Sequence, residues 1–142
     1  MNQRQAIQYM RTAVLWSWMS RDKRRQVGCV LVKEDILVAS YNGTPPGWDN
    51  TCQQDDVTLP EVIHAEENCL DKFLRAGISP VGATVFTTDA PCLKCAIRLA
   101  NAQVAKVHYM REYRLQDGIE HLIARGISIS KMEIISEYQD RG

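Results

Sequence analysis

Apolar positions in the first third of the chain change from helical spacing to strand-like runs. Ile7, Met10, Val14 and Trp18 recur every three or four residues, which predicts an amphipathic helix over residues 3–20. Two β-rich runs follow at 27–32 and 36–41, and the short link between them predicts a β-hairpin. Turn residues then dominate residues 42–60, and the length of this stretch predicts a loop that lines an active site.

Helical and strand patterns alternate through the second half of the chain. The expected elements are a helix at 64–76 that stops before Gly77, a strand at 83–88, a helix at 91–102, a strand at 105–110, a helix at 115–125 and a strand at 127–134. Strands joined through helices are parallel. The predicted fold is therefore a three-layer α/β/α arrangement, in which a mixed five-stranded sheet (a β-hairpin followed by β-α-β-α-β) carries helices on both faces. A chain of 142 residues predicts one domain over residues 1–142.

Charge and cysteine content narrow the class of protein. Seventeen Lys and Arg residues balance seventeen Asp and Glu residues, so no basic field predicts a nucleic-acid partner. No uncharged apolar run reaches the roughly 18 residues of a membrane span, so we expect no membrane association. Five cysteines, an odd number, favour reduced thiols and a metal over disulfides. These features predict a cytoplasmic protein.

One imidazole and two thiols form the candidate metal site. His64 and the Cys92-x-x-Cys95 pair supply three ligands for a tetrahedral Zn²⁺, which leaves a fourth position for water. Glu66, outside the ligand set, would take a proton from that water and return it to the substrate, so it is the candidate catalytic residue. The prediction is one zinc ion per chain.

Helix geometry restricts where these residues can lie. Residues two apart in a helix point about 200° away from each other, so His64 and Glu66 can share a site only if the helix begins at His64 or just before it. Pro91 suits the first turn of the later helix, where Cys92 and Cys95 would lie on one face. Two helix N-termini would then meet at the metal and favour thiolate over thiol.

Other interpretations of the cysteines and histidines remain open. A closed structural zinc site needs a fourth ligand, which Cys29, Cys52, Cys69, His108 or His121 could provide. A thioredoxin-like redox pair would use Cys92 and Cys95 but would leave His64 and Glu66 unexplained. A non-catalytic, zinc-stabilised binding module is the alternative of another functional class.

Residues from about 15 to 130 resemble the deoxycytidylate (dCMP) deaminases of the cytidine deaminase-like superfamily, possibly of a viral or phage type. The resemblance rests on Gln26-Val27-Gly28, Tyr41-Asn42-Gly43 with Pro45 and Gly47, His64-Ala65-Glu66 with Asn68, and Pro91-Cys92 with Cys95-Ala96. It implies zinc-dependent hydrolysis of dCMP to dUMP and ammonia, which supplies the precursor of dTTP. A free nucleoside or base, or a tRNA base, is the alternative substrate.

The resemblance also assigns substrate contacts. Asn42 is expected to hold the deoxyribose hydroxyl, backbone groups of Ala65 and Ala90 to contact the base edge, and Tyr113 to contact base or phosphate. Independently of the family, four cations within residues 21–25 predict a local phosphate site, because Arg binds phosphate in a bidentate manner. Arg21, Arg25 and the adjacent Gln26 are its candidate residues. The dense positive charge also raises dCTP as a second substrate.

Regulation and assembly follow from the resemblance alone. Family members are typically homohexamers that dCTP activates and dTTP inhibits. An effector, with Mg²⁺ as its possible companion ion, would lie near Tyr41, Gly43 and Trp48. If the source is viral, the expected location is the host cytoplasm.

Overall fold

The computed structural model describes residues 1–45, 47–48, 52–54, 57–58 and 62–134. Four helices and seven strands lie within these ranges. In chain order they are α1 (Gln3–Ser17), β1 (Gly28–Lys33), β2 (Ile36–Tyr41), β3 (Gln53–Gln54), β4 (Val57–Thr58), α2 (Ala65–Arg75), β5 (Thr84–Asp89), α3 (Leu93–Asn101), β6 (Lys106–Arg111), α4 (Asp117–Ala124) and β7 (Ser128–Lys131).

Five strands form one mixed sheet in the order β2-β1-β5-β6-β7. The hairpin pairs β1 with β2 antiparallel, with Gly28 opposite Tyr41, and β1 also runs antiparallel to β5. The pairs β5·β6 and β6·β7 are parallel, as helical crossovers require. The prediction of a hairpin followed by a parallel β-α-β-α-β unit is confirmed.

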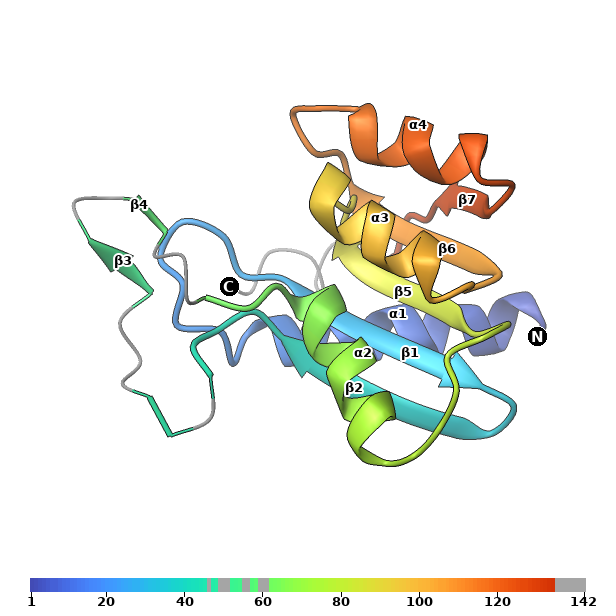
Figure 1. Ribbon diagram of the computed structural model, residues 1–142, viewed down its shortest axis with the longest axis horizontal. Coiled ribbons are helices and arrows are strands. Elements are labelled where there is room, and N and C mark those ends of the chain that lie inside the picture. Colours follow the sequence, from blue (N-terminus) through green and yellow to red (C-terminus); the bar gives the residue numbers. More distant parts are fainter. Residues whose placement is uncertain (46, 49–51, 55–56, 59–61, 135–142) are drawn as a thin grey trace.

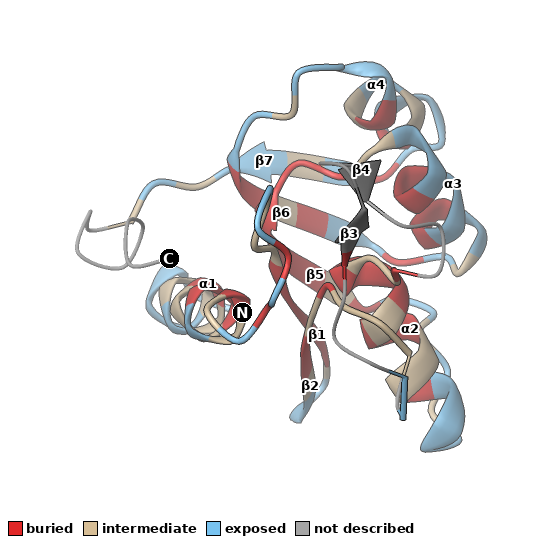
Figure 2. Ribbon diagram, turned by 90° about the vertical axis from the view of Figure 1, so that its left-hand side faces the viewer, coloured by how far each residue is buried: buried red, intermediate tan, exposed pale blue. Residues whose placement is uncertain are grey.

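Helices cover both faces of the sheet, but unequally. Helix α1 lies alone on one face, whereas α2, α3 and α4 cover the other (Figures 1 and 2). The side chains of β1 alternate between the two faces of the sheet. Cys29 and Leu31 pack in the core under α2–α4, and Val30 and Val32 pack in the core under α1. The three-layer prediction is therefore confirmed.

Helix α1 packs very closely on the start of β1. A Cβ atom at Gly28 would lie 1.8 Å from the carbonyl oxygen of Ala13, so only glycine fits there. The helix ends at Ser17, earlier than predicted, because the Trp18 N–H bonds to the carbonyl of Leu15 in a tight final turn. Residues 18–27 therefore lie outside the helix and connect it to the start of β1.

The other predicted elements differ from the observed ones only at their ends. Helix α2 stops before Gly77 (φ +72°), as expected from a C-terminal glycine. The predicted active-site loop at 42–60 lies partly outside the described residues; within it, β3 and β4 pair as a small separate sheet. Within the described ranges, no helix combines the length and the apolar character that a membrane crossing requires.

Candidate active site

His64 lies at the start of α2 and not inside it. It is the N-cap residue with extended backbone (φ −71°, ψ 153°), and Ala65 is the first helical residue. The Glu67 side chain closes the cap by accepting a hydrogen bond from the His64 N–H at 3.4 Å. The prediction that the helix begins at His64 is confirmed, so His64 and Glu66 can both face one cavity.

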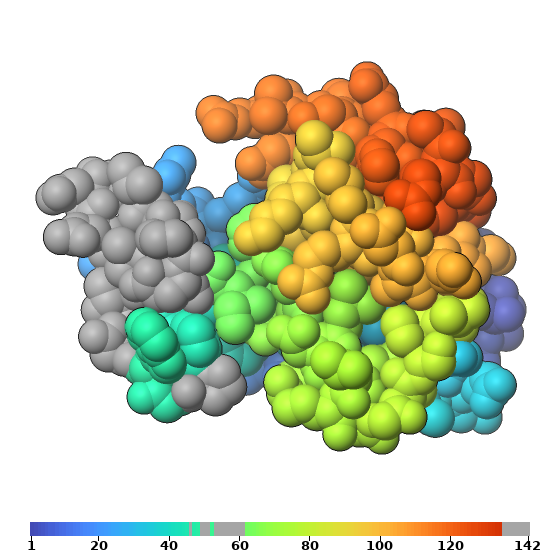
Figure 3. All heavy atoms as spheres, in the orientation of Figure 1, coloured from blue at the N-terminus to red at the C-terminus, as the bar shows by residue number. Residues whose placement is uncertain are grey.

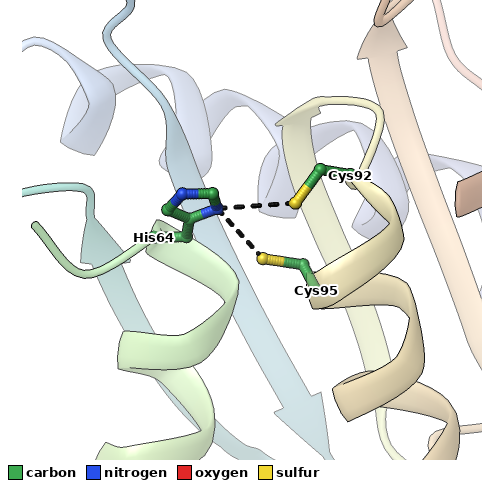
Figure 4. Close-up of side chains that lie close together, drawn as sticks. All are labelled: His64, Cys92 and Cys95. Carbon is green, nitrogen blue, oxygen red and sulfur yellow. Dashed lines mark hydrogen bonds between the residues drawn. The ribbon is translucent and has the colours of Figure 1, made fainter. Parts of the chain in front are cut away.

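The two cysteines lie at the start of α3. Cys92 is the N-cap residue, in extended conformation, and its carbonyl accepts the first helical hydrogen bond, from Ala96, at 2.8 Å. The prediction of a helix from residue 91 with Pro91 in its first turn is therefore wrong by two residues. Cys95 nevertheless lies three residues after Cys92, on the same side of the helix start. Figure 4 shows both sulfur atoms directed at the His64 ring.

The ligand atoms of His64, Cys92 and Cys95 all lie within 4.8 Å of one another. The Nδ1 atom of His64 is 3.2 Å from the Cys95 sulfur and 3.6 Å from the Cys92 sulfur. In the described part of the chain, no further His, Cys, Asp or Glu joins this group. Three donors, two of them thiols, match an open catalytic zinc site better than a closed structural one.

Two of the residues suggested as a fourth ligand, Cys69 and His108, are engaged elsewhere. The Cys69 sulfur, buried under the sheet, lies 3.0 Å from Ser40 Oγ and 3.3 Å from the Cys29 carbonyl oxygen. His108 stacks on Phe86 with ring centroids 4.9 Å apart. These contacts belong to the packed interior and to the sheet surface, not to the metal cluster.

Hydrogen bonding and burial shift the titration of the cluster. Hydrogen bonds from Cys95 and then His64 lower the pKa of Cys92 to about 4, against the opposing effect of burial. As the donor to Cys92, the Cys95 thiol has its pKa raised, and burial acts in the same direction. The hydrogen bond to Cys92 raises the pKa of His64. Burial raises the pKa of Glu66 to about 7.

A cavity of about 450 Å³ opens beside the cluster, a volume typical of small-molecule sites. Two of the candidate metal ligands, His64 and Cys92, line it together with the buried Glu66 and three arginines. Its described lining consists of Asp22, Arg24, Arg25, Val27, Asn42, Val62, His64, Ala65, Glu66, Asp89, Ala90, Cys92, Tyr113 and Arg114.

The buried carboxylate of Asp22 organises the cationic loop. It accepts hydrogen bonds from the backbone N–H groups of Arg24 (2.8 Å) and Arg25 (3.2 Å), which folds the chain into a turn. The Arg25 side chain pairs with Asp89 and lies over the Tyr113 ring, 4.6 Å from its centroid. Arg25 is thus held in a fixed place on the cavity wall.

Some of the predicted substrate contacts line the cavity and others do not. Ala65, Ala90, Asn42, Arg25 and Tyr113 line it. The buried Asn42 amide also binds the loop, because it accepts from the Val27 N–H at 2.9 Å and donates to the Arg25 carbonyl at 2.8 Å.

Arg21 and Gln26 are not among the described residues that line the cavity. Arg21 is exposed, and the Gln26 amide donates to the Ser20 carbonyl at 2.9 Å. The sequence reasoning did not assign Asp89, Arg24 or Arg114 to the site. Two of them could have been found from the sequence, because Arg24 belongs to the charge run at 21–25 and Arg114 directly follows Tyr113. Asp89 had a signal as well, as a charged residue directly after the predicted strand at 83–88.

The expected effector residues Tyr41, Gly43 and Trp48 are not among the described residues that line the cavity. The Tyr41 ring packs on Trp16 with centroids 6.1 Å apart. Gly43 pairs with Ile63 through two backbone hydrogen bonds, and Trp48 is 62% exposed.

The sequence pattern described as the cytidine and deoxycytidylate deaminase zinc-binding region matches residues 3–111, which include the whole cluster. The chain belongs to this deaminase family. Its α/β sheet with four helices is the fold of the family. The motifs on which the resemblance rests and the three candidate ligands all lie within the matched range.

Members of the deaminase family from distant sources are similar to this chain. The deoxycytidylate deaminase of Saccharomyces cerevisiae is 32% identical over 91% of this chain and 45% of its own length. A probable deoxycytidylate deaminase of Caenorhabditis elegans is 36% identical over 72% of this chain and 55% of its own length. The chain thus spans about half the length of these curated relatives. A crystal structure of the dCMP deaminase from cyanophage S-TIM5, in complex with dCMP and dUMP, superposes with a TM-score of 0.89 at 40% identity, covering 93% of this chain and 99% of that one.

Proposed function

We propose that this protein deaminates dCMP by hydrolysis to dUMP and ammonia. The observation that carries the proposal is that one cavity is lined by His64 and Cys92 of the His-Cys-Cys cluster, by a buried glutamate and by three arginines. The likeness to a dCMP deaminase determined with dCMP and dUMP supports the same substrate.

The donor set fits one zinc ion. His64, Cys92 and Cys95 would hold it, with their atoms close enough to share one ion and each at or near a helix N-terminus. A zinc ion bound there supplies a water of lowered pKa for attack on the ring carbon that bears the amine. Zn²⁺ is therefore the cofactor in this proposal.

Glu66 carries the protons of the reaction. Its carboxylate would take one proton from the attacking water and pass it to the ring nitrogen beside the attacked carbon. It would then move the second proton from the added hydroxyl to the amine, which leaves as ammonia while the carbonyl of dUMP forms. A carboxyl with a pKa near 7 is suited to both directions of transfer at neutral pH.

The base and sugar would meet the backbone and Asn42. The Ala65 carbonyl accepts from Ser40 Oγ at 2.6 Å, whereas its N–H, at the first position of α2, has no helical acceptor. The Ala90 N–H donates to the Arg111 carbonyl at 2.8 Å, so the group that Ala90 would offer to the base is its carbonyl. One donor and one acceptor suit the edge of a cytosine ring.

The phosphate would lie among Arg24, Arg25 and Arg114 at the cavity wall. We expect Arg24→Ala and Arg114→Ala to raise the KM for dCMP by about 10- to 100-fold, since a hydrogen bond to a charged group contributes about 1.5–3 kcal/mol. Turnover of deoxycytidine should not change in either variant. Arg21→Ala is the matched control, because Arg21 is exposed and outside the described lining.

A substrate panel tests the proposal directly. The fall in ultraviolet absorbance on deamination is followed with dCMP, deoxycytidine, dCTP and a tRNA substrate at equal protein concentration. The proposal predicts turnover of dCMP well above that of deoxycytidine. Turnover of dCTP to dUTP would add the second reaction that the cationic loop suggests. Equal rates for nucleoside and nucleotide, or activity on tRNA alone, would overturn the choice of dCMP.

Regulation and assembly belong to the same proposal. dCTP as activator and dTTP as inhibitor, with Mg²⁺ accompanying the triphosphate, would act near Tyr41, Gly43 and Trp48, and the assembly would be a homohexamer. The pairing of Gly43 with Ile63 links this region to the residue before His64. Rate measurements with each triphosphate and the molecular mass in solution test these points separately.

A further inference from the structure

Glu67 places a second buried carboxylate next to the candidate metal site. It is only 6% exposed, and it follows Glu66 in the first turn of α2. A buried carboxylate needs a cation or several donors, because loss of hydration destabilises the charged form. Glu67 has both: Arg98 and Lys94 approach it from α3, and the His64 N–H donates to it.

The contacts of Glu67 join the two helices that carry the metal ligands. Its Oε2 lies 3.0 Å from Arg98 Nη1, and its Oε1 lies 3.8 Å from Lys94 Nζ. Lys94 and Arg98 are four residues apart, so they share one face of α3. Helices α2 and α3 lie side by side on the face shown in Figure 3.

The spacing along both helices is the same. Glu67 comes three residues after His64, and Arg98 comes three residues after Cys95, so each partner is one turn from a candidate ligand. The ion pair therefore spans the two helices one turn below the point where His64 Nδ1 and the Cys95 sulfur are 3.2 Å apart. A shift of either helix would change both distances together.

We propose that Glu67 and Arg98 are positioning residues for the metal centre, in that their ion pair fixes α2 against α3 and so sets the separation of the three ligands. This inference rests on the proposed function. The hydrogen bond from the His64 N–H to Glu67 also holds the backbone of His64, which is itself a candidate ligand. Groups that orient metal ligands from outside the ligand set affect metal affinity by about 10- to 100-fold.

Zinc affinity tests the inference more directly than activity does. Dissociation constants are measured by competition with a chromogenic chelator for the unmodified protein, Arg98→Ala, Glu67→Gln and the double variant. We expect a loss of affinity of about 10- to 100-fold in each single variant. The double variant should lose little more than either single one, because the two residues act as a unit.

Asp71→Asn is the matched control. Arg98 Nη2 also lies 3.7 Å from Asp71 Oδ1, a half-exposed pair farther along α2. Removing this pair leaves the bond between Glu67 and Arg98, so zinc affinity should change by less than about threefold, as for exposed ion pairs in general. An equal loss in Asp71→Asn and Arg98→Ala would overturn the inference.

A spectroscopic readout separates positioning from general destabilisation. The Co²⁺-loaded protein is compared with Co²⁺-loaded Arg98→Ala, because the visible bands of Co²⁺ report ligand geometry. We expect altered bands in Arg98→Ala and partial recovery in Arg98→Lys, which restores the charge but not the planar fork. If Arg98→Ala does not fold, Glu67→Gln and Arg98→Lys, which keep the side-chain volume, decide the question.

The failure of this inference is distinguishable from failure of the proposed function. If the unmodified protein binds zinc and deaminates dCMP while Arg98→Ala and Glu67→Gln match its zinc affinity and Co²⁺ bands, only the positioning role is wrong. If the unmodified protein does not bind zinc, both are wrong.

Discussion

Burial gives Glu66 the character of a proton carrier. The side chain is 4% exposed at the second position of α2, and its burial raises the pKa to about 7, whereas the nearby His64 acts in the opposite direction. A solvent-exposed glutamate at pH 7 would almost never be protonated. Placement within one turn of a helix start thus supplies both the position and the acidity that the reaction needs.

Zinc binding should weaken as the pH falls, because protons compete for the same groups. The pKa values of His64, Cys95 and Glu66 are all raised, so these groups keep their protons to a higher pH than usual, and a nearby dication favours their deprotonated forms. Affinity should fall as the pH falls, with protons released on binding. Calorimetry in buffers of different ionisation enthalpy counts these protons.

Glu66→Gln provides the comparison. Because the raised pKa of Glu66 leaves part of it protonated at pH 7 and glutamine has no such proton, this variant should release fewer protons per zinc ion. Equal proton release by both proteins would contradict the raised pKa.

The sequence could identify the metal ligands but not which cations line the cavity. His64, Glu66, Cys92 and Cys95 follow from local spacing and ligand chemistry. The charge run at 21–25 predicted a phosphate site, yet the turn around Asp22 leaves Arg21 outside the described lining and brings Arg24 and Arg25 into it. Asp89 is distant from Arg25 in the sequence, so their pairing depends on the register of β5 in the sheet.

Close approach of α4 supports the loop that carries Cys92. A Cβ atom at Gly118 would lie 2.2 Å from the Pro91 carbonyl oxygen and 3.0 Å from the Cys92 carbonyl carbon. The second residue of α4 therefore touches the backbone at the start of α3. A side chain at this position would therefore push α4 and the backbone of residues 91–92 apart.

We expect Gly118→Ala to destabilise the fold by about 1–3 kcal/mol, as overpacking does, although alanine is the better helix former. Zinc affinity should fall as well, because Cys92 would be displaced. Thermal unfolding and chelator competition measure the two effects. Glu120→Ala, at an exposed position of the same helix, is the control and should leave both unchanged. A Gly118→Ala protein as stable as the original, with equal zinc affinity, would rule out this support.

At the level of elements, the spacing of apolar residues and the positions of turn residues predicted nearly every helix and strand. The errors are at the ends of the elements. Helix α3 begins two residues later than predicted. Cys92 has an extended backbone and is the N-cap residue, so its carbonyl accepts the first helical hydrogen bond while the residue itself lies outside the helix. The contact of Gly118 with Pro91 had no sequence signal, since the two residues meet only after the helices pack.

In the whole molecule, the candidate site lies where the starts of α2 and α3 meet on one face of the sheet (Figure 1). The alternation of strands and helices predicted the layered fold, because each crossover helix must cover a sheet face. The assignment of α1 alone to one face, with α2–α4 on the other, depends on packing between distant segments. Metal binding would link α2 and α3, which are otherwise joined through the sheet and through the ion pairs of Glu67 and Asp71 with α3.

Zinc should therefore stabilise the entire fold. At a free zinc concentration of about 1,000 times the dissociation constant, the gain is about 4 kcal/mol. For a domain of this size, with a shift of about 2–4 °C per kcal/mol, the melting temperature should rise by about 10 °C. Differential scanning calorimetry with zinc and with a chelator measures the shift. Cys95→Ser should lose most of it, and a similar rise in that variant would place zinc elsewhere.

The central claim is that Glu66 moves the protons of dCMP deamination beside a zinc ion held by His64, Cys92 and Cys95. The most direct measurement is the rate of dUMP formation by zinc-loaded Glu66→Gln and by the unmodified protein, at equal zinc content. We expect the unmodified protein to convert dCMP, and the variant to bind one zinc per chain, keep its fold and lose at least about 10²- to 10⁴-fold in rate. Comparable rates, or loss of zinc or of the fold in Glu66→Gln, would contradict the assignment.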